Sequence, residues 1–278
     1  MTYMTPPSLN GKIAAMHSAR SRRLHPHASP GFAGGTPASQ PLYKQVKDRI
    51  TRSLIAGEWK PGAAIPSEAE LSAHFKVSIG TIRRAIDELV AEKIVVRQQG
   101  RGTFVTIHTE DRQFYYFFHI VAKNGGKEPP AHELLSLQSV KADDDTARQL
   151  GIAQGAAVHR IHNVLKLAGD PVVFDELKIA AARFPDLDVQ TFGRRDGTIY
   201  GLYQSRYGIN VVRISERLSA AAAPARVAKV LGVKKDSALL LIKRVAYTYH
   251  DEPVEMRSSW VNTRRHEYLS DLWKNEPR

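Results

Sequence analysis

The chain has 278 residues, of which 42% are hydrophobic and 24% are charged, and it contains no cysteine. This length favours two domains, because a single hydrophobic core seldom grows beyond about 250–300 residues. The lack of cysteine excludes disulfides and thiolate chemistry, and no run of about 18 apolar residues predicts a membrane span. The formal net charge is +12, with its highest density in the N-terminal third, which fits a polyanionic partner there or a generally basic protein.

Residues 1 to 40 are rich in Ser, Pro, Ala, Gly and His, and they contain four basic side chains and no acidic one. A segment of this composition buries too little apolar surface to offset the entropy of ordering, so it is predicted to be a disordered extension. Its basic side chains have two interpretations: contact with DNA phosphates, or no role at all.

Residues 41 to 106 predict three helices followed by a hairpin. The first helix follows Pro41 and ends near Gly57, because apolar residues recur between them at a spacing of four. These apolar residues are Leu42, Val46, Ile50 and Leu54. Ser67 and Glu70 have the spacing of a capping box, which predicts a second, short helix.

A third helix is predicted to begin after Ser78, which can cap it, and to end near Lys93. Its apolar stripe has the spacing of one helix face and consists of Ile82, Ile86, Leu89 and Val90. Its other side presents Ser78, Thr81 and Arg84, with Arg83 at the edge. A hairpin over residues 95 to 105 completes the order of a winged helix-turn-helix. The alternative is a small helical bundle with an exposed polar face.

The tip of the hairpin, RQQGRG, favours DNA binding over the bundle alternative. Gly100 and Gly102 permit positive φ angles and a close approach of the backbone. Arg101 between them can project into a narrow, electronegative minor groove while the third helix enters the major groove.

Residues 41 to 106 resemble the DNA-binding domain of the GntR family of bacterial transcription regulators, on the segments PLYKQVKDRI, IPSEAELSAHFKVSIGTIRRAIDELVAEKIVV and RQQGRGTFV. The resemblance implies phosphate contacts by Tyr43 and Ser67, base reading by the start of the third helix, and a wing at the hairpin tip. The residues expected to contact DNA are Tyr43, Ser67, Ser78, Ile79, Gly80, Thr81, Arg83, Arg84, Gln99, Gly100, Arg101, Gly102 and Thr103.

Ile79 departs from the family pattern, because many members have an arginine directly after the small residue that caps the recognition helix. Arginine reads guanine through a bidentate contact, whereas an aliphatic side chain meets only a thymine methyl group or packs internally. We therefore expect the operator to differ at that position from the commonest site of the family.

The C-terminal part contains an internal duplication. A pattern of small and apolar residues from Ala147 to Val164 recurs 81 positions later, from Ala228 to Val245. Each copy predicts a short helix that ends in Leu-Gly, then a strand, a tight turn and a second strand. The two copies are expected to form related halves of one antiparallel sheet.

The segments RFPDL, TIYGLYQSRYGI and DEPVEMRSSWVNTRRHEY resemble the UTRA effector domain of the HutC branch, whose fold is similar to that of chorismate lyase. The expected fold class is α+β: an N-terminal winged helix-turn-helix joined to a C-terminal antiparallel-sheet α+β effector domain. The expected boundaries are a disordered extension at 1–40, the DNA-binding domain at 41–106, a linker at 107–113, the effector domain at 114–270 and a tail at 271–278.

In the UTRA family a small effector lies between the duplicated halves and is held by polar side chains on facing strands. Carried over by position, the expected effector-binding residues are Arg160, Asn163, Asp175, Thr198, Tyr200, Glu255 and Arg257. Each of them has the alternative of a satisfied polar group at a sheet edge.

The expected effector is a carboxylate or an amine. Relatives that bind phosphorylated sugars have two arginines where this chain has Asn163 and Leu165, so a bidentate clamp for phosphate is missing. A carboxylate is expected to bind Arg257 or Arg160, and Glu255 is expected to accept from an amine or hydroxyl.

The sequence predicts no metal site, cofactor or catalytic residue. The acidic run at 143–145 directly precedes a predicted helix, so capping explains it better than a cation does. His159 and His162 alternate onto different faces of a strand, and no Gly-x-Ser-x-Gly elbow or Walker-type loop is present.

The expected function is a homodimeric transcription regulator, with a repressor favoured over an activator. It would bind an imperfect palindrome in double-stranded operator DNA in the bacterial cytosol, respond to a small-molecule effector and have no membrane partner. Two alternatives remain open: a small-molecule enzyme of lyase-like fold with an attached DNA-binding module, and a DNA-binding protein without an effector.

Overall fold

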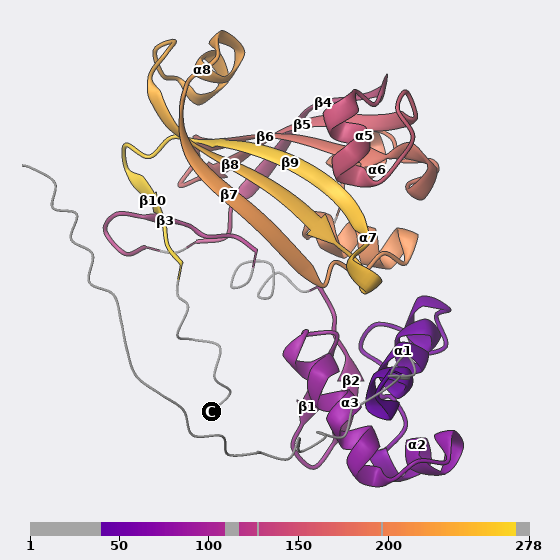
Figure 1. The fold of residues 1–278 in the computed structure, drawn as a ribbon. Coiled ribbons are helices and arrows are strands. Elements are labelled where there is room, and N and C mark those ends of the chain that lie inside the picture. Colours follow the sequence, from indigo (N-terminus) through magenta and orange to yellow (C-terminus); the bar gives the residue numbers. More distant parts are fainter. Residues whose placement is uncertain (1–39, 109–116, 127, 196, 271–278) are drawn as a thin grey trace, which may run out of the picture. The chain divides into compact units, whose positions relative to one another are not determined.

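A computed structural model describes residues 40–108, 117–126, 128–195 and 197–270 (Figure 1). The predicted extension up to residue 39, most of the predicted linker at 107–113 and the predicted tail at 271–278 lie outside the described residues. Within the described ranges, no helix is long and apolar enough to cross a membrane.

Three helices and a hairpin follow one another in the N-terminal part, in the predicted order. They are α1 (Leu42–Ile55), α2 (Glu68–Phe75), α3 (Ile79–Ala91), β1 (Val95–Gln98) and β2 (Gly102–Val105). The predicted capping box begins α2: the Ser67 backbone N–H donates to Glu70 Oε2 at 2.8 Å, and Ser67 Oγ accepts from the Glu70 N–H at 3.3 Å. This part is therefore a winged helix-turn-helix.

One apolar core joins the three helices to the hairpin. Its buried side chains include Val46, Ile50, Leu71, Ile82, Ile86 and Leu89. Leu42 was predicted on the same stripe, but it is 51% exposed, because it is the first residue of α1 and the core begins one turn later. Burial of the remaining stripe is the main force that holds a helical module of this size together.

A six-stranded antiparallel sheet forms the C-terminal part, with the strand order β4-β5-β6-β9-β8-β7 (Figure 1). Its strands are β4 (Ala131–Lys141), β5 (Ala157–Leu167), β6 (Asp170–Ala180), β7 (Arg213–Ala222), β8 (Ala238–Tyr247) and β9 (Pro253–Val261). Two short strands, β3 (Ile120–Ala122) and β10 (His266–Tyr268), pair separately.

The two halves of this sheet each contain the predicted helix and hairpin, and each has one further strand before the helix, β4 in the first half and β7 in the second. The helices are α5 (Asp144–Leu150) in the first half and α8 (Ala225–Leu231) in the second. Each ends in a left-handed glycine, Gly151 with φ 62° and Gly232 with φ 63°, a C-cap conformation that other residues rarely adopt. The halves meet where β6 pairs with β9, at the centre of the sheet.

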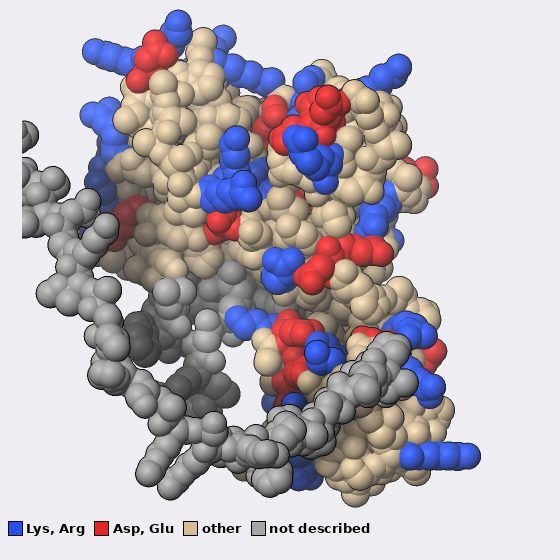
Figure 2. Space-filling view, viewed as in Figure 1, with Lys and Arg blue, Asp and Glu red and all other residues tan. Residues whose placement is uncertain are grey.

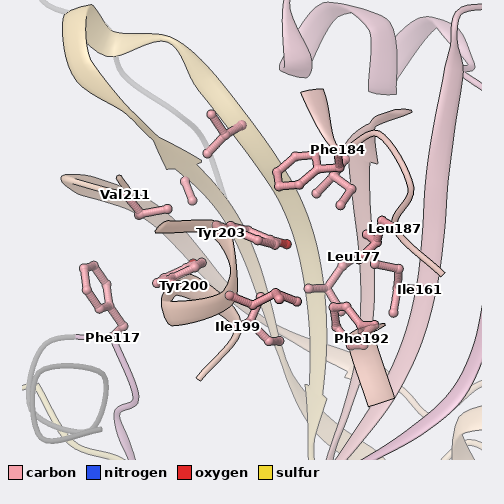
Figure 3. Packing of buried hydrophobic residues seen from close by; sticks show 14 residues of the cluster. Phe117, Ile161, Leu177, Phe184, Leu187, Phe192, Ile199, Tyr200, Tyr203 and Val211 are labelled. Atoms are coloured by element: carbon pink, nitrogen blue, oxygen red, sulfur yellow. The ribbon is translucent and has the colours of Figure 1, made fainter. Parts of the chain in front are cut away.

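Helices cover both faces of the sheet, and strand alternation decides which side chains face each layer. The connection between the halves carries α6 (Val189–Gly193) and α7 (Ile199–Tyr207), and two 3-10 turns occur at Ala181–Arg183 and Tyr249–Asp251. Tyr200 and Tyr203 of α7 pack on Ile161 and Leu177 on one face (Figure 3). On the other face, Val164 packs with residues of α8. The start of α7 therefore lies over the first face, where the cavity is found.

Candidate functional sites

The N-terminus of α3 presents short polar groups and one aliphatic side chain to solvent. Ser78 caps the helix, because its Oγ accepts from the Thr81 N–H at 3.2 Å and lies 2.9 Å from Thr81 Oγ1. Ile79 is 46% exposed, and Gly80 beside it is also exposed. An exposed isoleucine at the first helical position is available for contact with a partner, because no core contact holds it.

The two arginines of α3 are held in defined positions by neighbours from other helices. Arg83 forms an ion pair with Glu68 of α2 at 3.0 Å. The Arg84 guanidinium lies over the Tyr43 ring of α1, 4.0 Å from its centroid. Both side chains stay exposed, so these contacts orient them weakly and leave N–H groups that can donate hydrogen bonds to an anionic partner.

The wing tip has the backbone that its glycines predict. Gly100 has φ 70° and Gly102 has φ 114°, both in the left-handed region that disfavours other residues. Arg101 between them is exposed, and its guanidinium lies 5.9 Å from the Phe104 ring centroid, without an ion pair to any described residue. Arg97 at the base of the tip differs, because it is tied to Glu68 at 3.1 Å and to Asp87 at 2.5 Å.

The remaining predicted DNA contacts lie on or beside these elements. Gln99 is exposed at the tip, and the Thr103 carbonyl accepts from the Ile65 N–H at 2.9 Å, which fixes the wing to the segment before α2. Ser67 Oγ is already engaged, since it donates to Glu70 Oε2 at 2.7 Å. The backbone N–H and the hydroxyl group of Ser67 thus both take part in capping α2.

Basic and acidic side chains are interspersed on the face of the molecule that Figure 2 shows. On the face in Figure 2, Lys and Arg side chains lie in separate small groups with Asp and Glu between them.

A cavity of about 160 Å³ lies on the face of the sheet next to the start of α7. Its polar lining includes Asp175, Arg195, Thr198, Arg244, Arg257 and Ser259, from β6, β8, β9 and the segment before α7, together with His119, His132 and Tyr268. Apolar residues, among them Leu165, Val173 and Ile242, complete the wall. A largely apolar cavity with a few convergent polar groups is the usual form of a small-molecule site.

Asp175 is the buried acid of this cavity. It lies on β6 between Asn163 of β5 and Ser259 of β9, which are its cross-strand neighbours. Its Oδ1 accepts from Ser259 Oγ at 2.5 Å, and its Oδ2 lies 3.6 Å from Arg257 Nη1. Burial raises the pKa of the Asp175 carboxyl, although the positive charge of Arg257 acts in the opposite direction.

Glu255 lies behind the cavity wall and is fully buried. Its carboxylate accepts from Tyr203 OH at 2.8 Å and from Tyr200 OH at 3.3 Å, and it pairs with Arg257 Nη2 at 2.7 Å. Burial, together with the negative charge of Glu255, raises the pKa of Tyr200 to about 12, so this phenol stays protonated and donating. Glu255, Tyr200 and Arg257 thus satisfy one another before any ligand enters.

The structure gathers only some of the predicted effector residues at the cavity. Asp175, Thr198 and Arg257 line it, and Thr198 caps α7 instead of lying on a strand. Asn163 is buried beside Asp175, but neither it nor Arg160 is part of the lining. Arg160 bonds to Gln138 Oε1 at 3.0 Å, and its strand position puts it on the sheet face opposite to Asn163.

Two arginines that line the cavity were not among the residues expected from the sequence. Arg244 on β8 forms an ion pair with Glu216 at 2.6 Å and donates to the Phe117 carbonyl at 2.5 Å. Arg195 lies between α6 and α7, in a polar stretch that resembles an ordinary surface loop. Neither carries a motif, and only the packing of distant segments brings them together.

Within the described ranges, no group of three or more His, Asp or Glu side chains is placed to hold a metal ion. The acidic run at 143–145 caps α5 as predicted, because Asp143 Oδ1 accepts from the Thr146 N–H at 2.7 Å. His159 and His162 occupy strand positions of opposite parity.

Two family models match the chain over most of its described length. Residues 42–105 match the family described as bacterial regulatory proteins, gntR family. Residues 126–267 match the UTRA domain.

Several curated relatives carry the names of repressors. The HTH-type transcriptional repressor NagR of Bacillus subtilis is 28% identical over 232 residues, which is 82% of this chain and 93% of that protein. The histidine utilization repressor of Klebsiella aerogenes is 34% identical over 150 residues, which is 54% of this chain and 62% of that protein.

A solved structure shares the fold of the C-terminal part. The ligand-binding domain of a GntR-family transcriptional regulator from Bordetella bronchiseptica aligns with a TM-score of 0.54 at 29% identity. The alignment covers 57% of this chain and 98% of that domain.

Proposed function

Because this chain belongs to the GntR family of bacterial transcription regulators and carries the UTRA domain of its HutC-type members, we propose that it represses genes next to an operator and releases that operator when a small effector binds. The observation that carries this proposal is the pairing of an exposed α3 N-terminus and an arginine-tipped wing with a separate polar cavity in the same chain.

The proposed DNA contacts divide by chemistry. Ser78 to Thr81 at the start of α3 would meet base edges in the major groove, and Arg101 would enter the adjacent minor groove. The side chains proposed to contact phosphate are Tyr43, Ser67, Arg83 and Arg84, together with groups of the wing from Gln99 to Thr103.

The active form is proposed to be a homodimer on an imperfect palindrome in the cytosol. A two-fold protein presents two copies of α3, and these select DNA with two related half-sites about one helical turn apart. We retain residues 41–106 as the DNA-binding domain and residues 114–270 as the effector domain.

Effector binding would reach the DNA-binding domain through α7. Thr198 at the start of this helix lines the cavity, and Gln204 further along it holds the segment that follows β2. Gln204 Oε1 accepts from the His108 N–H at 2.9 Å, and its Nε2 donates to the Thr106 carbonyl at 3.0 Å. A ligand that prefers one position of α7 would therefore favour one arrangement of residues 106–108.

The test of DNA recognition is selection of genomic fragments by the full-length protein, followed by binding titrations at several salt concentrations. A regulator should bind selected duplexes at least about a thousandfold more tightly than random competitor. Equal affinity for selected and random duplexes at every salt concentration would refute the proposal.

A further inference from the structure

Arg195 has a buried guanidinium that forms no ion pair with a described carboxylate. The residue is 9% exposed and lines the cavity. Its Nη1 donates to the Phe192 carbonyl at 2.7 Å, and the guanidinium carbon lies 4.5 Å from the Phe192 ring centroid. Nε has no hydrogen-bond partner among the described residues, and no bond of Nη2 to them is found.

The other two guanidinium groups of the cavity are already neutralised. Arg244 pairs with Glu216 at 2.6 Å, and Arg257 pairs with Glu255 at 2.7 Å and lies 3.6 Å from Asp175. Of the three arginines that line the cavity, Arg195 alone lacks a carboxylate partner within the described part of the chain.

An unpaired buried cation is unfavourable unless a partner arrives. Burial lowers the pKa of Arg195 to about 10, and the nearby charge of Asp175 offsets this effect only in part, so the group remains charged at neutral pH without a direct carboxylate partner. The Nε–Nη2 edge is the side of a guanidinium that binds a carboxylate through two parallel hydrogen bonds. No hydrogen bond to a described residue occupies this edge, and its Nε is a buried donor without a partner.

The cavity also contains a group of opposite polarity. Asp175 Oδ2 has no hydrogen-bond donor among the described residues, since Ser259 bonds the other carboxylate oxygen. This acid disfavours a second negative charge on the ligand, and it can accept from a hydroxyl or amino group. One unpaired guanidinium edge and one acidic acceptor match a ligand with a single negative charge and a nearby donor.

We propose that Arg195 is the anion-binding residue of the effector site and that the effector is a small hydroxy or amino carboxylate, whose carboxylate binds Arg195 and whose hydroxyl or amine binds Asp175. This inference rests on the proposed effector role of the cavity. It replaces Arg160 and Arg257 as the expected partners of the carboxylate. A cavity of about 160 Å³ accommodates such a compound, since engineered cavities of roughly 150 Å³ admit benzene.

The test uses minimal probes on the full-length protein, with thermal unfolding as the readout and ionic strength held constant with sodium chloride. The probes are glycolate, acetate, glycolamide and inorganic phosphate. Glycolate is expected to raise Tm more than acetate, because it adds a hydroxyl for Asp175, whereas glycolamide, which has no charge, gives no rise. The substitution Arg195→Gln is expected to weaken the apparent affinity for glycolate at least tenfold.

The matched control is Arg194→Gln, which removes an exposed arginine from the neighbouring position and should leave the response to glycolate unchanged. Two further variants keep the test valid if Arg195→Gln folds poorly. Arg195→Lys retains the charge but loses the fork, so it should give an intermediate response. Asp175→Asn should reduce the response to glycolate to the level of acetate.

Equal Tm shifts with glycolate in the wild type and in Arg195→Gln would overturn the assignment, as would a wild type that responds to none of the carboxylates. A response to phosphate alone that is lost in Arg195→Gln would keep the anion site but reject the carboxylate. Operator binding by the wild type is measured in the same buffer without any probe. If the wild type does not bind operator under these conditions, the result contradicts the proposed function and leaves the role of Arg195 unaffected.

Discussion

Ile79 is the residue that we expect to bear most directly on which operator is bound. It lies at the first position of α3 and is 46% exposed, so a larger side chain there meets no internal obstacle. Its aliphatic surface can contact a thymine methyl group but cannot read guanine.

We predict that Ile79→Arg shifts the preferred base at one position in each half-site toward guanine, while Ile79→Val leaves the preferred site unchanged. Each good bidentate contact to guanine contributes about 1–3 kcal/mol of discrimination against another base. The measurement is a selection of binding sites from random duplexes with all three proteins. An identical consensus for Ile79→Arg and the wild type would rule out a reading role at this position.

Arg101 is predicted to contribute to binding but not to folding. It is exposed and makes no ion pair with a described residue, so Arg101→Ala should weaken operator binding by about 1–3 kcal/mol and leave Tm nearly unchanged. Arg217→Ala, which removes an exposed arginine from the effector sheet, serves as the control and should affect neither quantity. Operator affinity is measured by titration at one fixed salt concentration.

Glu255, in contrast to Arg101, is predicted to contribute to the stability of the fold. Glu255→Ala leaves Arg257 buried without its main partner and frees two buried tyrosine hydroxyls, so it should reduce the free energy of unfolding by about 3–5 kcal/mol. The control is Glu252→Ala, which removes a half-exposed pair with Arg183 and should cost at most about 1 kcal/mol. Denaturant titration measures both, and similar losses would contradict the network described for Glu255.

At the scale of the element, α5 depends on the charge of its cap. The hydrogen bonds to Thr146 and the contact with Lys178 lower the pKa of Asp143 to about 2 in the folded protein, below the value of about 3.9 in an unfolded chain. The stabilisation is therefore complete above that unfolded value and is lost as the pH falls from about 4 to about 2.

Asp143→Ala is predicted to lower the free energy of unfolding by about 0.5–2 kcal/mol at pH 7, and the difference from the wild type should shrink as the pH falls through this range. Asp144→Ala, in the first turn of the same helix, should give a smaller difference, because the capping side chain of α5 is that of Asp143 and not that of Asp144. Thermal unfolding between pH 7 and pH 2 provides the measurement. A difference for Asp143→Ala that does not change with pH would refute the charged cap.

The parity of strand positions separates two members of the expected effector set. Arg160 and Asn163 are three residues apart on β5, so they face opposite sides of the sheet and cannot both reach one ligand. This restriction follows from the two-residue period of a strand and was already available from the sequence. Asn163 shares a row with Asp175 and Ser259, which is the row that the cavity uses.

At the scale of the whole molecule, the cavity needs both halves of the duplicated sheet and the segment that joins them. Asp175 comes from the first half, Arg257 and Ser259 come from the second, and Arg195 and Thr198 lie in the connection. Neither repeat contains the site by itself. A ligand in this cavity would therefore act on α7, which belongs to the same connection.

Gln204→Leu is predicted to separate DNA binding from the effector response. The change removes the bonds to His108 and Thr106, so the His108 amide should exchange faster with solvent while operator affinity in the absence of effector stays within about threefold. The decrease in operator affinity caused by glycolate should become smaller than in the wild type, where coupling of about 1–3 kcal/mol is typical of such proteins. Gln190→Leu, an exposed glutamine of α6, is the control.

Hydrogen exchange followed by mass spectrometry and operator titration together check this prediction. Unchanged exchange at residues 106–108 combined with an unchanged glycolate effect would show that α7 does not carry the coupling. A complete loss of operator binding would instead mean that Gln204 maintains the DNA-binding domain itself.

The sequence by itself determined the local elements, the family and the regulatory function, because these depend on short-range patterns. The capping box at Ser67, the glycines of the wing and the Leu-Gly ends of the repeated helices each act within a few residues, and all were confirmed. Tertiary structure decided which polar groups meet at the cavity. Arg195 and Asp175 lie far apart along the chain, and no sequence motif links them. Arg257 forms an ion pair with Glu255 and Arg195 stays without a described carboxylate partner only because the strands and the connection pack together. Ion pairing in a buried site depends on distance in space, which a pattern of neighbours along the chain does not encode.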